Sequence, residues 1–106
     1  MNMVANKSRI FQEVYNLVSK IPKGKVTTYK ILAQRLNIKN PQLVGKILNQ
    51  NPYLIKIPCH RVIKSNGQIG GYKLGMIKKI NLLKDEGVII KNRKVTNFQN
   101  ILEKFE

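Results

Sequence analysis

Two short helices are predicted by residues 26–49, VTTYKILAQRLNIKNPQLVGKILN. Either Thr27 or Thr28 can cap the first helix, because a threonine hydroxyl accepts a hydrogen bond from an N–H of the first turn. Residues 37–40 form a short turn, and Pro41 suits the first position of the second helix, where no N–H donor is needed. Two helices joined in this way are typical of a helix-turn-helix. An ordinary helical hairpin would show the same pattern.

The flanking residues extend this pair into a small, mostly helical domain. Residues 8–21 have the apolar spacing of an amphipathic helix, with Ser8 as its cap. The Ser-Asn-Gly at 65–67 lies between short β-prone runs and predicts a β-hairpin. Residues 75–86 predict a fourth helix, which Gly87 ends. The expected fold class is therefore mostly α: a winged-helix-like helix-turn-helix domain with a small β-hairpin.

Composition points to a polyanionic partner. The 106 residues include 20 Lys and Arg against 5 Asp and Glu, which gives a formal net charge of +15. Such an excess is typical of nucleic-acid-binding proteins, although a lysine-rich surface without a partner is the alternative. We find no signal-peptide pattern and no run near the ~18 apolar residues that a membrane span needs. We therefore expect a cytoplasmic protein without a membrane partner, associated with the nucleoid if the source is prokaryotic.

The only cysteine lies in the run Ile57-Pro58-Cys59-His60-Arg61-Val62. A thiol beside an imidazole is the minimum equipment for nucleophilic catalysis, because the thiolate is the reactive form. A buried structural cysteine next to a chance histidine is the alternative. One Cys and one His cannot form an internal disulfide or a structural zinc site, so we expect no metal and no cofactor.

A catalytic histidine usually needs a third group that fixes its tautomer. Between Val14 and Leu102 the only acidic side chains are Asp85 and Glu86, so a triad must use one of these two unless a terminal helix folds back. The residues alone do not choose between them. Solvated charge at a helix end is the other interpretation.

Several ordered blocks resemble the O6-alkylguanine-DNA alkyltransferases over roughly residues 10–87. The blocks are Val26-Thr27-Thr28-Tyr29, Val44-Gly45, Asn51-Pro52, the Cys59 run, Ser65-Asn66-Gly67, Gly70-Gly71-Tyr72 and Glu86-Gly87. The resemblance divides the chain into an N-terminal extension (1–9), a catalytic and DNA-binding domain (10–87) and a C-terminal tail with a short helix (88–106). It implies a monomer that acts on double-stranded DNA carrying O6-alkylguanine.

The resemblance implies a DNA-repair reaction that each molecule performs once. Cys59 would attack the O6-alkyl carbon of guanine, chiefly in O6-methylguanine, and keep the alkyl group. His60 would act as base through a water, and Glu86, rather than Asp85, would orient His60. Asn51 would hold the active-site turn.

The resemblance also assigns binding residues around a base flipped out of the duplex, a movement that costs a few kcal/mol. Tyr29 would assist catalysis at the guanine. The implied substrate-binding residues are Leu48, Val62, Tyr72, Lys73 and Lys79, and the implied DNA-binding residues are Thr28, Gln42, Gly45, Lys46 and Arg61. The helix at residues 41–49 would enter the minor groove. Without the resemblance, Lys79 would be read as a solvated cation.

The chain departs from the family pattern in three respects. Gln42 stands where the family usually has an arginine that fills the gap left by the flipped base, and glutamine lacks that charge and planar fork. Leu48 stands where a methionine often occurs, and we expect this chain to lack the N-terminal domain that many members carry. Two other functions compete: a lesion-sensing alkyltransferase-like protein, in which the cysteine is replaced, and a winged-helix DNA-binding regulator, which would not use Cys59.

Overall fold

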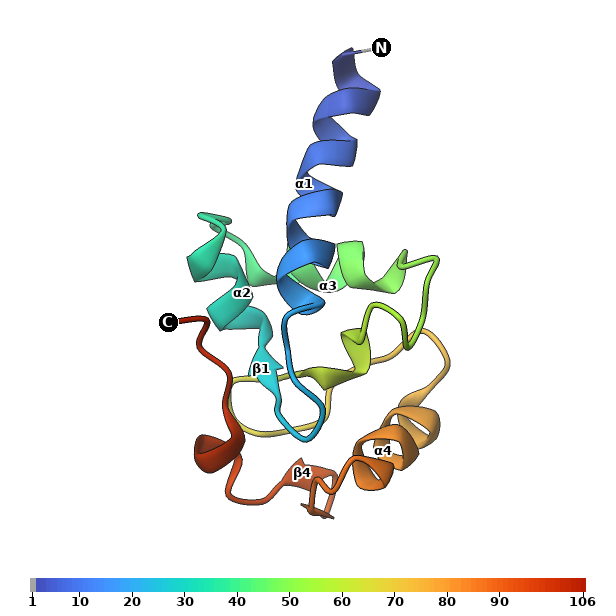
Figure 1. Ribbon diagram of the computed structural model, residues 1–106, viewed down its shortest axis with the longest axis vertical. Helices are drawn as coiled ribbons and strands as arrows, with labels where there is room; N and C mark the ends of the chain where they lie inside the picture. Colours follow the sequence, from blue (N-terminus) through green and yellow to red (C-terminus); the bar gives the residue numbers. More distant parts are fainter. Residues whose placement is uncertain (1) are drawn as a thin grey trace.

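The molecule has a helical upper part and a lower part that contains the C-terminal tail (Figure 1). The computed structural model describes residues 2–106. The helices are α1 (Asn2–Val18), α2 (Tyr29–Arg35), α3 (Pro41–Asn49) and α4 (Met76–Asp85), with 3-10 turns η1 (Cys59–Arg61) and η2 (Phe98–Ile101). The strands are β1 (Thr27–Thr28), β2 (Val62–Ile63), β3 (Ile90–Lys91) and β4 (Lys94–Val95). Within the described residues, no helix is both long and apolar enough to cross a bilayer.

The predicted helix-turn-helix is confirmed in α2 and α3. Thr28 caps α2, because its Oγ1 accepts a hydrogen bond from the N–H of Ile31 at 3.0 Å. Asn40 caps α3 through Oδ1, which accepts from the N–H of Gln42 at 2.9 Å, and Pro41 occupies the first turn. The two helices pack on each other, α3 also packs on α1, and together these elements confirm the mostly helical fold class.

The first helix is longer than the sequence predicts. It begins at Asn2 rather than Ser8, so the prediction that Ser8 caps it is wrong. No proline or glycine interrupts residues 2–18, so nothing stops the helix before Ser8. It ends at Val18, three residues before Ile21, and the N-terminal half of the ribbon extends beyond the body (Figure 1).

The β-hairpin does not form at the predicted place. The Ser-Asn-Gly turn closes, because the N–H of Gly67 donates to the carbonyl of Lys64 at 2.9 Å. However, β2 pairs in parallel with β1, in the register Thr27–Val62 and Thr28–Ile63. The hairpin is instead β3–β4, with a tight turn at residues 92–93. Its Asn-Arg turn lacks the Asn-Gly signal that identifies such turns in a sequence.

The C-terminal tail packs against the body. Val26 forms a parallel bridge with Leu102: its N–H donates to the carbonyl of Ile101 at 2.9 Å, and its carbonyl accepts from Glu103 N–H at 2.7 Å. The predicted tail helix is therefore only the 3-10 turn η2, because residues 102–103 are extended beside β1. Side chains of η2 cover a second core cluster between α4 and the tail.

Candidate active site

Cys59 lies at the wall of a cavity between α3 and the loop of residues 64–73. The cavity has a volume of about 780 Å³. It is lined by Tyr29, Lys30, Pro41, Gln42, Gly45, Lys46, Leu48, Asn49, Cys59, Lys64, Ser65, Asn66, Gly71, Tyr72 and Lys73. Cys59 is only 5% exposed. It begins the turn η1, in which the N–H of Arg61 donates a hydrogen bond to the carbonyl of Pro58 at 2.9 Å. A ligand therefore reaches the sulfur through the cavity.

Asn51 holds the loop that carries the cysteine. It is fully buried, and its Nδ2 donates to the carbonyl of Ile57 at 2.9 Å and to the sulfur of Cys59 at 3.4 Å. Its Oδ1 accepts from the N–H of Tyr53 at 2.8 Å. The loop contains Ile55 at a φ of +73°, which β-branched residues rarely adopt. The loop conformation thus depends on the hydrogen bonds that hold it, and the Asn51 side chain forms three of them.

His60 and Glu86 form a buried pair behind the cysteine. His60 is fully buried, and its Nε2 lies 3.0 Å from Oε2 of Glu86. Because a carboxylate only accepts hydrogen bonds, Nε2 carries the proton and Nδ1 of the neutral ring is left as the basic nitrogen. Nδ1 has no hydrogen-bond partner among the described residues. It is the atom that can take a proton from the thiol, directly or through a water.

Arg61 fixes the position of Glu86. Its Nε donates to Oε1 at 2.9 Å and its Nη2 to Oε2 at 2.7 Å, while Nη1 donates to the carbonyl of Ile21 at 2.8 Å. Burial by itself would raise the pKa of Glu86, but the hydrogen bonds from Arg61 and His60 outweigh burial and lower this pKa. The carboxyl group is therefore ionised at neutral pH. This two-point fork is a geometry that only arginine supplies.

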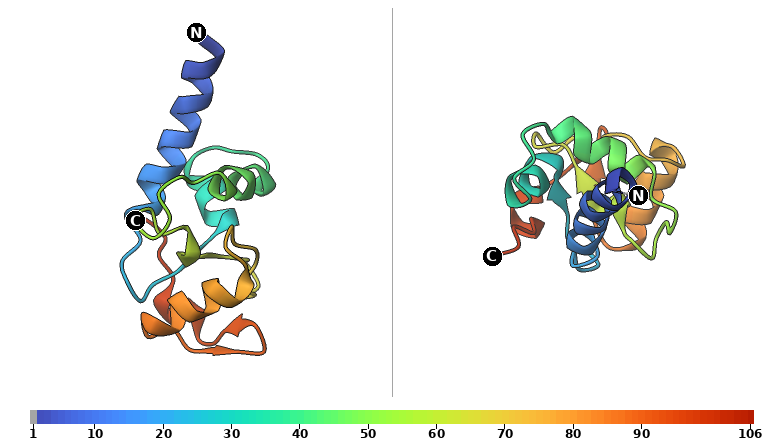
Figure 2. Two further views of the ribbon diagram at one scale, coloured as in Figure 1. Left: turned by 90° about the vertical axis from the view of Figure 1, so that its right-hand side faces the viewer. Right: turned by 90° about the horizontal axis from the view of Figure 1, so that it is seen from above.

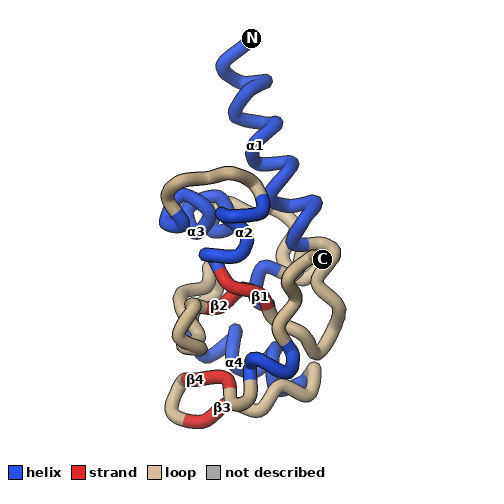
Figure 3. The backbone as a smooth tube through the Cα atoms, turned by 90° about the vertical axis from the view of Figure 1, so that its left-hand side faces the viewer, coloured by secondary structure: helices blue, strands red, loops and turns tan. Residues whose placement is uncertain are grey.

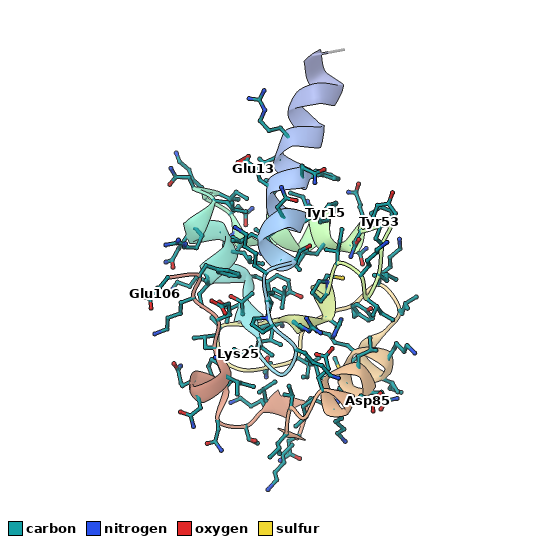
Figure 4. All side chains as sticks on the ribbon, in the orientation of Figure 1. Glu13, Tyr15, Lys25, Tyr53, Asp85 and Glu106 are labelled. Atoms are coloured by element: carbon teal, nitrogen blue, oxygen red, sulfur yellow. The ribbon has the colours of Figure 1, made fainter. Side chains whose placement is uncertain are left out.

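Asp85, the other acid left open by the sequence, takes no part in this network. It is exposed at the C-terminal end of α4 (Figure 4). Glu86 follows it as the C-terminal cap residue of α4, which directs its side chain toward His60. The structure thus places Glu86, not Asp85, beside the histidine.

The thiol and the imidazole are both neutral at rest. Burial raises the pKa of Cys59, although the hydrogen bond from Asn51 and the positive charges of Lys79 and Lys73 partly offset it. Burial lowers the pKa of His60, and the hydrogen bond to Glu86 partly offsets that shift. The thiolate must therefore form during the reaction rather than before it. Such a reaction needs a proton acceptor, and the unpartnered Nδ1 of the adjacent His60 is the candidate.

Lys79 is buried under the cavity, although the residues alone suggest a solvated cation. Its Nζ donates to the carbonyls of Val62 at 2.6 Å and Gly71 at 3.0 Å, and lies 3.5 Å from the hydroxyl of Tyr29. Burial lowers the pKa of Lys79 to about 7. Burial also raises the pKa of Tyr29 to about 12, so its hydroxyl stays protonated. The carbonyl of Val62, a predicted substrate-binding residue, thus already accepts a hydrogen bond from Lys79.

Most of the predicted substrate- and DNA-binding residues line the cavity. They are Gln42, Gly45, Lys46, Leu48, Tyr72 and Lys73, and Tyr29, which is predicted to assist catalysis, also lines the cavity. A Cβ on Gly45 would meet only the Tyr29 ring, at an ordinary 3.9 Å, so helix packing does not require this glycine. The ring of Tyr72 also meets His60 edge-on, with centroids 6.4 Å apart.

Two predicted DNA contacts lie elsewhere. Thr28 is 3% exposed and caps α2, and the guanidinium of Arg61 is taken up by Glu86 and Ile21. Neither residue lines the cavity, so the structure gives Thr28 a folding role and Arg61 a positioning role. Lys30 and Lys64, which the residues alone do not predict as site residues, also line the cavity. Their only signal in the sequence is the general excess of lysine.

The fold and the site define a helix-turn-helix domain with a cysteine nucleophile in its cavity. Residues 9–88 match the family model described as "6-O-methylguanine DNA methyltransferase, DNA binding domain". The chain therefore belongs to this family, as the cysteine run and its flanking blocks predict.

Named relatives agree with this assignment. A methylated-DNA–protein-cysteine methyltransferase of Saccharolobus islandicus is 53% identical over 77 residues, which are 73% of this chain and 50% of the relative. One from Candida glabrata is 45% identical over 82 residues, covering 76% of this chain and 40% of the relative. The chain thus spans half or less of the length of these two curated relatives.

Solved structures share the fold. The O6-methylguanine-DNA methyltransferase of Pyrococcus kodakaraensis gives a TM-score of 0.69 at 41% identity, over 74% of this chain and 46% of that one. S. pombe Atl1, in complex with damaged DNA containing O6-carboxymethylguanine, gives a TM-score of 0.80 at 28% identity. That alignment covers 92% of this chain and 96% of Atl1.

Proposed function

We propose that this protein repairs DNA by transferring the alkyl group of O6-alkylguanine, chiefly O6-methylguanine, from duplex DNA to its own Cys59. The observation that carries the proposal is the Cys59 sulfur at the cavity wall, backed by the His60–Glu86 pair at 3.0 Å. The family and the names of the relatives support it. The protein would act as a monomer wherever it meets chromosomal DNA, in the cytoplasm or at the nucleoid.

The proposed reaction is one nucleophilic displacement. The sulfur of Cys59 forms a bond to the alkyl carbon while the bond from that carbon to O6 breaks, and O6 keeps the bonding electrons. The thiol proton passes to Nδ1 of His60, and the resulting imidazolium is stabilised by the ionised Glu86. The guanine then takes up a proton from its surroundings. Because Cys59 ends as a thioether, no thiol remains, and each molecule reacts once.

The cavity suits a base that has left the duplex stack. O6 is inaccessible within stacked DNA, so the nucleotide must be flipped out before attack. Lysines at positions 30, 46, 64 and 73 line the cavity and can neutralise the phosphates of the displaced strand, contacts that carry no sequence information. A repair protein needs this generality, since lesions arise in any sequence.

A second function is favoured by one observation. Atl1 resembles this chain over nearly the whole of both molecules, so a domain of this size could recognise a lesion without reacting. Cys59 argues against that function, because the sulfur and its proton acceptor are both in place. A sensor would not use either group.

Intact mass decides between these two functions. The protein is incubated with duplex DNA that contains one O6-methylguanine, with an undamaged duplex as control, and the intact protein is weighed. We expect a stoichiometric gain of one methyl group, mapped to Cys59 by peptide analysis. Lesion-selective binding without a mass change would refute the transfer reaction and support the sensor.

Gln42 is expected to limit repair in duplex DNA. It is exposed in the first turn of α3 and lines the cavity, where a side chain can fill the gap in the stack. We expect Gln42→Arg to speed methyl transfer from duplex DNA several-fold but to leave the reaction with free O6-benzylguanine unchanged, because only the duplex has a stack to fill. Single-turnover rates with both substrates measure this.

Gln50→Arg is the matched control for this substitution. Gln50 is exposed at the other end of α3 and does not line the cavity. The arginine in this control therefore adds the same charge as Gln42→Arg but does not reach the base stack. An equal gain in both variants would show that general charge, and not the position of residue 42, sets the rate.

A further inference from the structure

We infer that the β3–β4 hairpin is a second DNA-contact surface, which binds the phosphate backbone of duplex DNA outside the cavity. The inference rests on the proposed function, since it concerns how the same duplex is held. The hairpin lies beyond residues 9–88, the part that matches the family model. It carries three basic residues in four positions, Lys91, Arg93 and Lys94, all exposed.

The hairpin lies on the same face of the molecule as the cavity. The left view of Figure 2 places α3, the loop of residues 64–73 and the hairpin along one side, and Figure 3 shows the same alignment from the opposite direction. The loop of residues 19–26, between α1 and β1, lies on the other side in both views. A duplex seated at the cavity therefore passes toward the hairpin and away from the 19–26 loop.

Backbone hydrogen bonds fix the hairpin to the rim of the cavity. The N–H of Ile69 donates to the carbonyl of Arg93 at 3.0 Å, and the N–H of Val95 donates to the carbonyl of Gly67 at 2.9 Å. Gln68 and Lys94 form an antiparallel bridge between these two bonds. Because the 65–67 turn lines the cavity with two of its residues, the hairpin keeps a constant position relative to Cys59.

The charges on the hairpin are concentrated and unpaired. Lys91 stands directly opposite Lys94 in the strand register, and like charges in that position are unfavourable for a hairpin. No acidic residue occurs between Gly87 and Leu102, and within the described part of the chain none of the three basic side chains forms a salt bridge. A bound polyanion would reduce the repulsion among these three positive charges.

The turn of the hairpin presents an arginine where glycine fits more easily. Asn92 and Arg93 both adopt left-handed backbone angles, with φ of +52° and +61°. Asparagine tolerates this conformation, whereas the second position of such a turn is usually glycine. Arg93 therefore has an unfavourable backbone conformation, but its position places a guanidinium at the exposed tip of the hairpin. Arginine binds a phosphate by two parallel hydrogen bonds.

The test compares three triple variants. The hairpin variant is Lys91→Gln with Arg93→Gln and Lys94→Gln. The control removes the same charge from the opposite face, with Lys20→Gln, Lys23→Gln and Lys25→Gln. These three control lysines are exposed. A third variant, Lys91→Arg with Arg93→Lys and Lys94→Arg, keeps the charge and shows whether the hairpin still folds and binds.

Affinity is measured against salt concentration for lesion-containing duplexes of about two helical turns and about one turn, roughly 21 and 10 base pairs. The binding constant K falls as salt rises, and each lost phosphate contact makes the slope of log K against log salt less negative by about 0.9. We expect the slope of the hairpin variant to become shallower by up to about 2.7, which is about 0.9 for each of its three lost charges, and its affinity for the long duplex to fall at least roughly tenfold at about 0.1 M salt. The charge-conserving variant should keep the salt slope of the unmodified protein, because that slope depends on the number of charges, and the two glutamine variants should bind the short duplex equally.

Equal slopes for the hairpin and control variants on the long duplex would overturn the inference. The inference would also be overturned if the hairpin variant lost affinity for single-stranded RNA but not for duplex DNA. Methyl transfer to Cys59 is followed in the same samples and separates the two proposals. If the unmodified protein neither binds the lesion duplex nor gains a methyl group, the proposed function fails and the hairpin inference fails with it. If it does both and the slopes are equal, only the hairpin inference fails.

Discussion

Replacing Cys59 with alanine is expected to abolish methyl transfer completely and to leave the affinity for duplex DNA within about twofold. Cys59 is the single cysteine of the sequence and lines the cavity, and its proposed proton acceptor is Nδ1 of the adjacent His60. The phosphate contacts come from other residues and persist in the variant. Intact mass after incubation with O6-methylguanine duplex measures the transfer, and fluorescence anisotropy with the same duplex measures the affinity.

Cys59→Ser separates the chemistry of the sulfur from its packing. Serine keeps the size of the side chain and a hydrogen-bond partner for Asn51, but its hydroxyl stays protonated and is a far weaker nucleophile than a thiol. We expect this variant to bind the lesion and not to react. A methyl gain in either variant would place the acceptor at another residue and refute the assignment of Cys59.

The sequence predicts those features that depend on local spacing. Thr28 caps α2 and Pro41 begins α3, as the pattern indicates, because these signals act over a few residues. The cysteine run also indicates the site correctly, since Cys59 and His60 are neighbours in the chain. The choice of Glu86 over Asp85 came from the family resemblance. The structure shows the reason: Glu86 is the C-terminal cap residue of α4 and its side chain reaches His60.

Features that depend on distant contacts could not be predicted from the residues. Lys79 is fully buried because the carbonyls of Val62 and Gly71 satisfy its ammonium group, and neither partner is close in sequence. The strand β2 pairs with β1, which is distant in the sequence, and the hairpin is β3–β4. The family resemblance implies a DNA contact for Arg61, whereas in the structure both ends of its guanidinium fork bind Glu86.

The second large effect is expected at Glu86. We expect Glu86→Gln to slow methyl transfer roughly 10²-fold, within the range that general acid–base catalysis contributes. The neutral amide would no longer stabilise the imidazolium that forms on His60 when it takes the thiol proton. It would also leave the half-buried Arg61 without its anionic partner. Single-turnover rates with O6-methylguanine duplex measure the loss.

Asp85→Asn is the matched control, because it removes the same charge from the adjacent, exposed position, and we expect its rate to change by less than about twofold. The pH profile distinguishes a catalytic effect from simple loosening of the fold. Glu86 raises the pKa of His60 against the effect of burial, so its removal lowers that pKa and shifts the acid limb of the profile to lower pH. A uniformly slower enzyme with an unshifted limb would mean that Glu86 only maintains the structure. Equal losses in the two variants would exclude Glu86 from the triad, since only one of these carboxylates reaches His60.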